Sequence, residues 1–147
     1  MMRYLTAVSA ISLLFAVGCA VATSNKIEVS LDESFQLKVG ESALISPENI
    51  AVTFLAVTAD SRCGKGETCI WAGDGVVQIS VHLNGVDLGK YEVHSNPREG
   101  SAASFDKFNI RLVSLLPPAD AGTVIAQDEY VAVLRVGRGF AGNDGVY

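Results

Sequence analysis

Apolar and polar residues alternate in short stretches along most of the chain after residue 26. Residues 27–31 read Ile-Glu-Val-Ser-Leu, and residues 35–39 read Phe-Gln-Leu-Lys-Val. Strict alternation is the pattern of a β-strand with one buried and one solvated face, because successive side chains of a strand point to opposite sides. No long stretch shows the period of an amphipathic helix. Strands are predicted at residues 27–31, 35–39, 42–45, 50–58, 76–83, 86–93, 105–116 and 130–136.

Several of these segments carry more specific expectations. Residues 50–58 are mostly apolar and β-branched, which favours a central strand covered on both faces. Asn84-Gly85 is typical of a tight hairpin turn. Residues 105–116 are interpreted as one strand, residues 94–104 as a long polar loop, and residues 119–128 as a loop with one short helical turn.

Strands spaced about ten residues apart, with turns between them, predict an all-β domain built as an antiparallel β-sandwich. An immunoglobulin-like or related Greek-key arrangement is the first choice, and a small β-barrel is the alternative. The predicted core consists of the inward-facing residues of both sheets: Val29, Leu37, Val39, Val52, Phe54, Ile79, Val81, Ile110, Leu112, Val131 and Val133.

The first 18 residues have the pattern of an export signal. Arg3 precedes an uncharged apolar run at residues 5–17, and this run is shorter than the about 20 residues that span a bilayer. The sequence Ala16-Val17-Gly18-Cys19 resembles the bacterial lipobox, in which the cysteine sulfur receives a lipid. The alternative is an ordinary secretory signal that is cleaved near Ala20 or Ala22. The lipobox interpretation divides the chain into a signal peptide (1–18), a lipidated N-terminus and linker (19–26), a β-sandwich domain (27–137) and a flexible tail (138–147).

The three cysteines fit this division. Lipidation of Cys19 leaves Cys63 and Cys69, and two glycines between them allow the short loop to close as a disulfide. The alternative is a metal site, for which two thiolates supply only half of the ligands. His82 and His94 would have to complete such a site, so no cofactor and no metal is predicted.

Composition restricts the partners. The chain has 11 basic and 16 acidic residues, a formal net charge of −5, and no cluster of lysines or arginines. An acidic domain of this kind is a poor ligand for phosphate backbones, so we expect no binding to nucleic acid. The same charge excludes a polybasic attachment to lipid headgroups, and membrane attachment is therefore expected through the N-terminal lipid alone.

Residues 60–63 (Asp-Ser-Arg-Cys) and 69–73 (Cys-Ile-Trp-Ala-Gly) resemble the signature of a group of small exported bacterial lipoproteins of uncharacterised function. Weaker similarity continues through later strands and covers most of the predicted domain. The resemblance implies a sandwich with a disulfide-closed loop and no particular activity. This chain has Gly64 where the group usually has proline, which predicts a more flexible loop.

The segment around the cysteines is the candidate binding loop. Trp71 is expected to be a buried anchor that packs on the disulfide or in the sandwich centre. Arg62 is expected to pair with Asp60 or Asp74 at the base of the loop. Ala72 and Gly73 are small, as required where two backbones approach closely. The candidate binding residues are Arg62, Lys65, Glu67, Trp71 and Asp74.

Three functions are open, and the first is preferred. It is a non-enzymatic binding or structural module of the cell envelope, contacting an envelope protein or glycan, with the outer membrane favoured by Ala20. The second is a peptidase inhibitor that presents Lys65 between two glycines. The third is a metal-binding or enzymatic protein, in which His82 and Asp87 face each other across the hairpin. No catalytic nucleophile accompanies that pair, so catalysis is not predicted. The oligomeric state is left open.

Overall fold

The computed structural model describes residues 26–139 of the chain. The predicted signal peptide, Cys19 and the chain beyond Gly139 lie outside the described residues. Among residues 26–139, no α-helix occurs. No helix of this part of the chain is long and apolar enough to cross a membrane.

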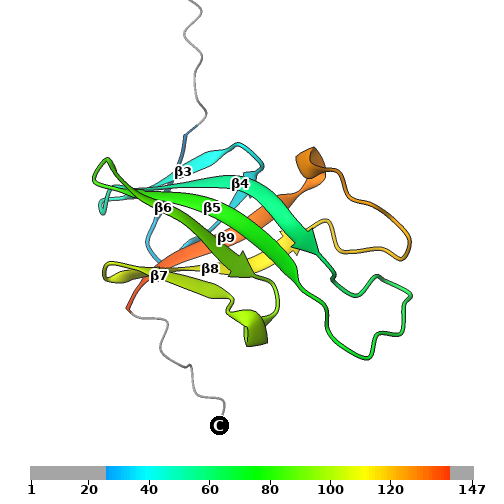
Figure 1. Ribbon diagram of the computed structural model, residues 1–147. Coiled ribbons are helices and arrows are strands. Elements are labelled where there is room, and N and C mark those ends of the chain that lie inside the picture. The colour runs from blue at the N-terminus through cyan, green and yellow to red at the C-terminus, as the bar shows by residue number, and fades with distance from the viewer. Residues whose placement is uncertain (1–25, 140–147) are drawn as a thin grey trace, which may run out of the picture.

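The described chain folds into two β-sheets that lie face to face (Figure 1). The first sheet has the strand order β1-β3-β4-β5-β6, and the second has the order β2-β9-β8-β7. The predicted β-sandwich is therefore confirmed, and the sheets do not close into a barrel. All strand pairs are antiparallel except β1 and β3, which are parallel. The strands of the first sheet are β1 (Ile27–Ser30), β3 (Ser42–Ser46), β4 (Ile50–Asp60), β5 (Gly75–Leu83) and β6 (Val86–His94).

The second sheet is built from β2 (Ser34–Lys38), β7 (Ala102–Phe105), β8 (Phe108–Leu116) and β9 (Val131–Arg138). Two short 3₁₀ helices complete the described elements: η1 (Pro97–Glu99) after β6 and η2 (Gln127–Glu129) before β9. The helical turn predicted between residues 119 and 128 lies at the end of that loop as η2, which continues to Glu129. Arg138, which was predicted to begin the tail, is the last residue of β9.

The core lies between the two sheets and contains no buried polar or charged residue among those described. Most of the predicted core is buried, including Leu37, Phe54 and Ile110. The prediction was wrong on β9, where Val131 and Val133 are only partly buried and point away from the core. The residues of β9 that fill the core instead are Ala132, Leu134 and Val136. Val39 lies just beyond the end of β2 and is also only partly buried.

Three further predictions needed correction. Residues 105–116 do not form one strand, because Phe105 and Phe108 pair with each other across a two-residue turn at Asp106 and Lys107. Residues 102–104, predicted to be loop, form most of β7. Strand β4 is central in its sheet as expected, but only one of its faces is fully buried, and the residues of its other face are partly exposed.

The predicted hairpin at Asn84-Gly85 is confirmed. Both residues have positive φ, 51° and 80°, as the tight turn between β5 and β6 requires. At the other end of the sandwich, the connections after β4 and after β8 project side by side at the right of Figure 1. A main-chain bridge between Lys65 and Asp120 joins these two connections. This end of the molecule carries the candidate site.

Candidate functional site

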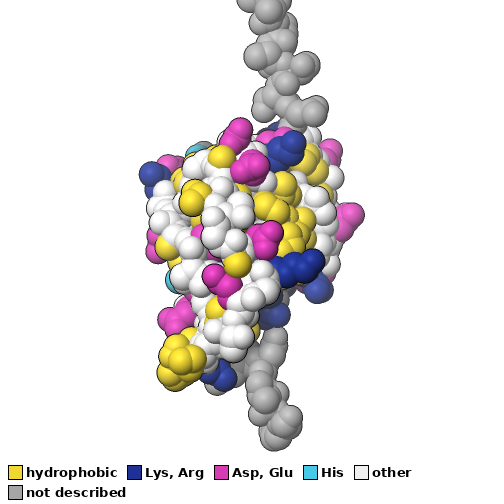
Figure 2. All heavy atoms as spheres, turned by 90° about the vertical axis from the view of Figure 1, so that its right-hand side faces the viewer, with side chains coloured by type: hydrophobic (Ala, Val, Ile, Leu, Met, Phe, Trp, Pro, Cys, Tyr) yellow, Lys and Arg dark blue, Asp and Glu magenta, His cyan; other side chains and the backbone are white. Residues whose placement is uncertain are grey.

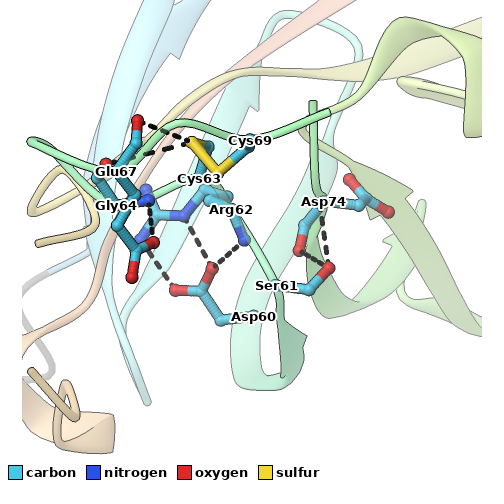
Figure 3. The surroundings of a disulfide bond; sticks show 8 residues. All are labelled: Asp60, Ser61, Arg62, Cys63, Gly64, Glu67, Cys69 and Asp74. Atoms are coloured by element: carbon cyan, nitrogen blue, oxygen red, sulfur yellow. Dashed lines mark hydrogen bonds and ion pairs between the residues drawn. A yellow bond between two sulfur atoms is a disulfide. The ribbon is translucent and has the colours of Figure 1, made fainter. Parts of the chain in front are cut away.

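The two ends of the β4–β5 loop, residues 61–74, contact each other. Ser61 at one end packs on Gly73 and Asp74 at the other, and these three residues form the neck of the loop. The amide of Ser61 donates a hydrogen bond to the carbonyl oxygen of Asp74 at 2.7 Å. The amide of Asp74 donates to the hydroxyl of Ser61 at 3.1 Å (Figure 3). Gly73 packs directly on Ser61: a Cβ atom at Gly73 would lie 1.7 Å from the Ser61 carbonyl oxygen. The expected close approach of two backbones is thus confirmed at Gly73. The neck holds the two ends of the loop at fixed separation.

The predicted disulfide between Cys63 and Cys69 is present, with the two Cα atoms 6.0 Å apart. Closing so short a ring stabilises the fold by about 2 kcal/mol, mainly by restricting the unfolded chain. Among the described residues, Cys63, Glu67 and Cys69 are the one group whose ligand atoms lie close enough to hold a metal. Both sulfurs are used in the disulfide, so neither is a thiolate ligand. His82 and His94 do not join this group.

One side of the β4–β5 loop packs on the connection after β8. The amide of Lys65 donates to the carbonyl oxygen of Ala119 at 2.9 Å. A Cβ atom at Gly64 would lie 2.7 Å from the amide nitrogen of Ala121, so the two chains approach closely there. The Gly64 amide also donates to the carboxylate of Glu67 at 3.1 Å. Glu67, predicted as a binding residue, therefore stabilises the loop itself.

Arg62 forms the partly buried base of the loop. Its guanidinium donates two hydrogen bonds to the carboxylate of Asp60, Nε to Oδ1 at 2.8 Å and Nη2 to Oδ2 at 2.7 Å, which confirms one of the two predicted pairings (Figure 3). It also donates to the carbonyl oxygens of Leu115 and Pro117. Because the guanidinium of Arg62 bonds the carboxylate of Asp60 and also two carbonyl oxygens at the end of β8, it links the β4–β5 loop to β8.

The phenol of Tyr130 completes this cluster. Its hydroxyl donates to Oδ2 of Asp60 at 2.9 Å. Burial by itself would raise the pKa of Asp60, but the hydrogen bonds from Arg62 and Tyr130 outweigh burial and lower that pKa below its ordinary value. Burial, followed by the bond to the Asp60 carboxylate, raises the pKa of Tyr130 to about 12. Asp60 is therefore an ionised structural anchor at neutral pH.

Asp74 holds the other side of the neck. Its carboxylate bonds Nδ1 of His94 at 2.6 Å and accepts from the Ser95 hydroxyl at 3.1 Å and the Asn96 amide at 2.9 Å. Burial opposes ionisation, yet these bonds, led by the one with His94, lower the pKa of Asp74. The carboxylate, predicted as a binding group, thus joins the β4–β5 loop to the segment that enters η1.

The prediction of a buried Trp71 was wrong. Trp71 is 79% exposed and its neighbour Ile70 is 90% exposed, the highest exposure of a large apolar pair adjacent in sequence among the described residues. Figure 2 shows hydrophobic side chains protruding from the lower edge of this end of the molecule. The disulfide at Cys69 fixes the chain just before Ile70, and the contact of Gly73 with Ser61 fixes it just after Trp71. The side chains of Ile70 and Trp71 between these two points remain in solvent.

Beside Trp71 lies a shallow open groove that sequence reasoning did not find. One wall is the β4–β5 loop from Ile70 to Asp74, and the other is the segment Asn96–Glu99. Residues 94–104 were predicted only as polar loop. The signal was present in Asn96-Pro97, a helix cap followed by a proline at the first helical position, and Asn96 does accept a bond from the Arg98 amide.

The remaining candidates lie apart from this groove. Lys65 is exposed, but its main-chain amide is already bonded to the neighbouring connection. His82 and Asp87 face each other on β5 and β6 as predicted, 4.0 Å apart, with His82 partly and Asp87 largely exposed, at the opposite end of the sheet. Comparison with known proteins adds no assignment: no protein-family model, curated protein or solved structure matches this chain.

Proposed function

We propose that the protein is a non-enzymatic binding module of the bacterial cell envelope, tethered through a lipid on Cys19, and that the end of the sandwich bearing the β4–β5 loop contacts its partner. One observation carries the proposal: Trp71 and Ile70 are held in solvent by a loop that is otherwise closed and bonded. Exposing an indole to water costs free energy that burial in the core would recover. A fold that keeps Trp71 outside therefore favours a role in recognition.

The rigidity of the loop supports this role. The disulfide, the bonded neck and the Arg62–Asp60 pair restrain residues 61–74 before any partner arrives. Binding then costs little ordering entropy, and a tryptophan in such a setting is a typical anchor residue of an interface. Binding residues commonly lie on loops positioned by a rigid scaffold, which matches the arrangement here.

The envelope location rests on the N-terminal sequence. Residues 16–19 match the pattern at which a cysteine is lipidated, and residues 20–26 would connect that lipid to β1. Fatty-acid labelling of the full chain and of Cys19→Ser in a bacterial host tests the tether. Label in the parent chain and none in the variant is the expected result, and equal labelling would contradict the tether.

The binding role is tested with the purified mature domain as bait for cross-linked envelope extract. Trp71→Ala should lose a component that the parent domain retains. Val113→Ala is the matched control, because Val113 is 51% exposed on the face of the other sheet. Equal capture by the parent domain and by Trp71→Ala would place the binding surface elsewhere.

A further inference from the structure

We propose that the groove beside Trp71 is a saccharide-binding site, in which one sugar ring stacks on the indole and its hydroxyl groups bond to the opposite wall. This inference rests on the proposed function and specifies its ligand. The groove has one apolar wall, at Ile70 and Trp71, and one polar wall, at Asn96, Arg98 and Glu99. A pyranose ring has the same division, with C–H groups on its faces and hydroxyl groups around its rim.

The indole offers the surface that a sugar face requires. Its π-face carries partial negative charge, which attracts the weakly positive C–H hydrogens of a sugar ring. Trp71 is 79% exposed, so no protein side chain has to move before a ring can stack. Stacking of this kind does not depend on a charged ligand, which suits a neutral glycan and a domain of net negative charge.

The polar wall has unused hydrogen-bonding groups. The side chains of Arg98 and Glu99 form no hydrogen bond or ion pair with any other described residue, and the side-chain nitrogen Nδ2 of Asn96 has no partner there either. Together they supply donors and an acceptor along one side of the groove. Sugar hydroxyl groups donate and accept at once, so a mixed set of this kind can bond several of them.

The two walls are held at a fixed spacing by Asp74. Its carboxylate belongs to the loop that carries Trp71, and it accepts from the amide of Asn96, the residue that begins the opposite wall. The bonds to His94 and Ser95 keep that carboxylate in place. The groove is therefore formed before a ligand binds, which reduces the entropy cost for a small and flexible saccharide.

The small size of the apolar surface disfavours a protein partner, and the charge of the domain disfavours a membrane surface. Ile70 and Trp71 together offer at most a few hundred Å² of apolar surface, since one aromatic side chain buries roughly 150–250 Å², whereas a stable protein interface buries about 800 Å² on each partner. An anionic membrane surface is also disfavoured, because the chain has a net charge of −5 and no cluster of lysines or arginines to attract such headgroups. A sugar ring needs no more area than one indole face provides.

The test uses the fluorescence of Trp71, which is the single tryptophan of the chain. The mature domain is titrated with chitotetraose, cellotetraose and maltotetraose, and is sedimented with purified cell-wall glycan. At least one saccharide should shift the Trp71 emission to shorter wavelength in a saturable manner, and the domain should sediment with the glycan that contains it.

Variants in the groove localise the binding. Trp71→Ala, followed by calorimetry, should bind about tenfold more weakly or worse, and Glu99→Gln should bind several-fold more weakly with the Trp71 signal intact. Asp128→Asn is the matched control, because Asp128 is an exposed carboxylate in η2, outside the groove. Full affinity in Trp71→Ala would overturn the site.

The result also separates this inference from the proposed function. If no saccharide shifts the Trp71 emission, while an envelope protein is captured through Trp71, the binding module stands and the saccharide is wrong. A shift with phospholipid vesicles alone would likewise overturn the saccharide. If neither saccharide, protein nor vesicle depends on Trp71, both proposals fail.

Discussion

At the scale of residues, the conformation of the β4–β5 loop depends on a few side chains and one glycine. Gly73 permits the neck of the β4–β5 loop to close on Ser61, and Tyr130 donates to the carboxylate that Arg62 also holds. The sequence indicated that Gly73 must be small and that Arg62 pairs with an aspartate. It gave no sign of Tyr130, because that residue lies 70 positions from Asp60 and only the fold brings them together.

The neck is tested by Gly73→Ala. The added methyl group meets the Ser61 carbonyl oxygen, so the neck has to open, and we expect the free energy of unfolding to fall by about 1–3 kcal/mol in urea denaturation. Ala72→Ser changes the exposed neighbouring residue and should alter stability by less than about 0.5 kcal/mol. Equal stability of Gly73→Ala and the parent chain would show that the neck is not closed as described.

The Tyr130 hydroxyl predicts a pH dependence at the alkaline end. Its pKa is about 12 in the folded protein, and a phenol in the unfolded chain has a pKa of about 10. A group with a raised folded pKa contributes stability that is complete below the unfolded pKa and is lost as the pH rises through the folded pKa. The stability advantage of the parent chain over Tyr130→Phe should therefore be about 1 kcal/mol at neutral pH and shrink between about pH 10 and 12. Urea denaturation of both proteins at several pH values measures it; a difference that stays constant across this range would contradict the assignment.

At the scale of elements, alternation located nearly every strand but left two ambiguities. Residues 130–134 are all apolar or aromatic, so these residues alone do not show which face of β9 points into the core. Arg135 is the residue that decides between the two faces. Arg135 is exposed and shares its face with Val131 and Val133, which places Leu134 inside. The β7–β8 turn was missed because Asp106-Lys107 lacks the glycine or asparagine of a typical tight turn.

The disulfide acts on the β4–β5 loop as an element. Replacing both cysteines, Cys63→Ser with Cys69→Ser, should lower the free energy of unfolding by about 2 kcal/mol and leave the strands intact. Amide hydrogen exchange should then accelerate in residues 61–74 and remain slow in β4 and β5, because both cysteines are exposed and neither belongs to the buried core. Faster exchange throughout both sheets would mean that the disulfide supports the whole fold.

At the scale of the whole molecule, the sandwich separates two tasks. The sheets bury a continuous apolar core, and one end carries the bonded loops, the groove and the exposed indole. The fold class and the disulfide could be predicted from the sequence, since periodicity and cysteine number are local signals. The exposure of Trp71 could not, because a lone tryptophan after a cysteine is compatible with a core position, and the closed neck at Gly73 together with the disulfide at Cys69 keeps it outside.

The most direct measurement is the emission spectrum of the purified mature domain, together with quenching by acrylamide, since Trp71 is the chain's single tryptophan. The account predicts the long-wavelength emission of a water-exposed indole in the folded protein, with quenching close to that of free tryptophan. A short-wavelength spectrum that resists acrylamide until urea unfolds the domain would show that Trp71 is buried, and would contradict the binding surface proposed for this end of the sandwich.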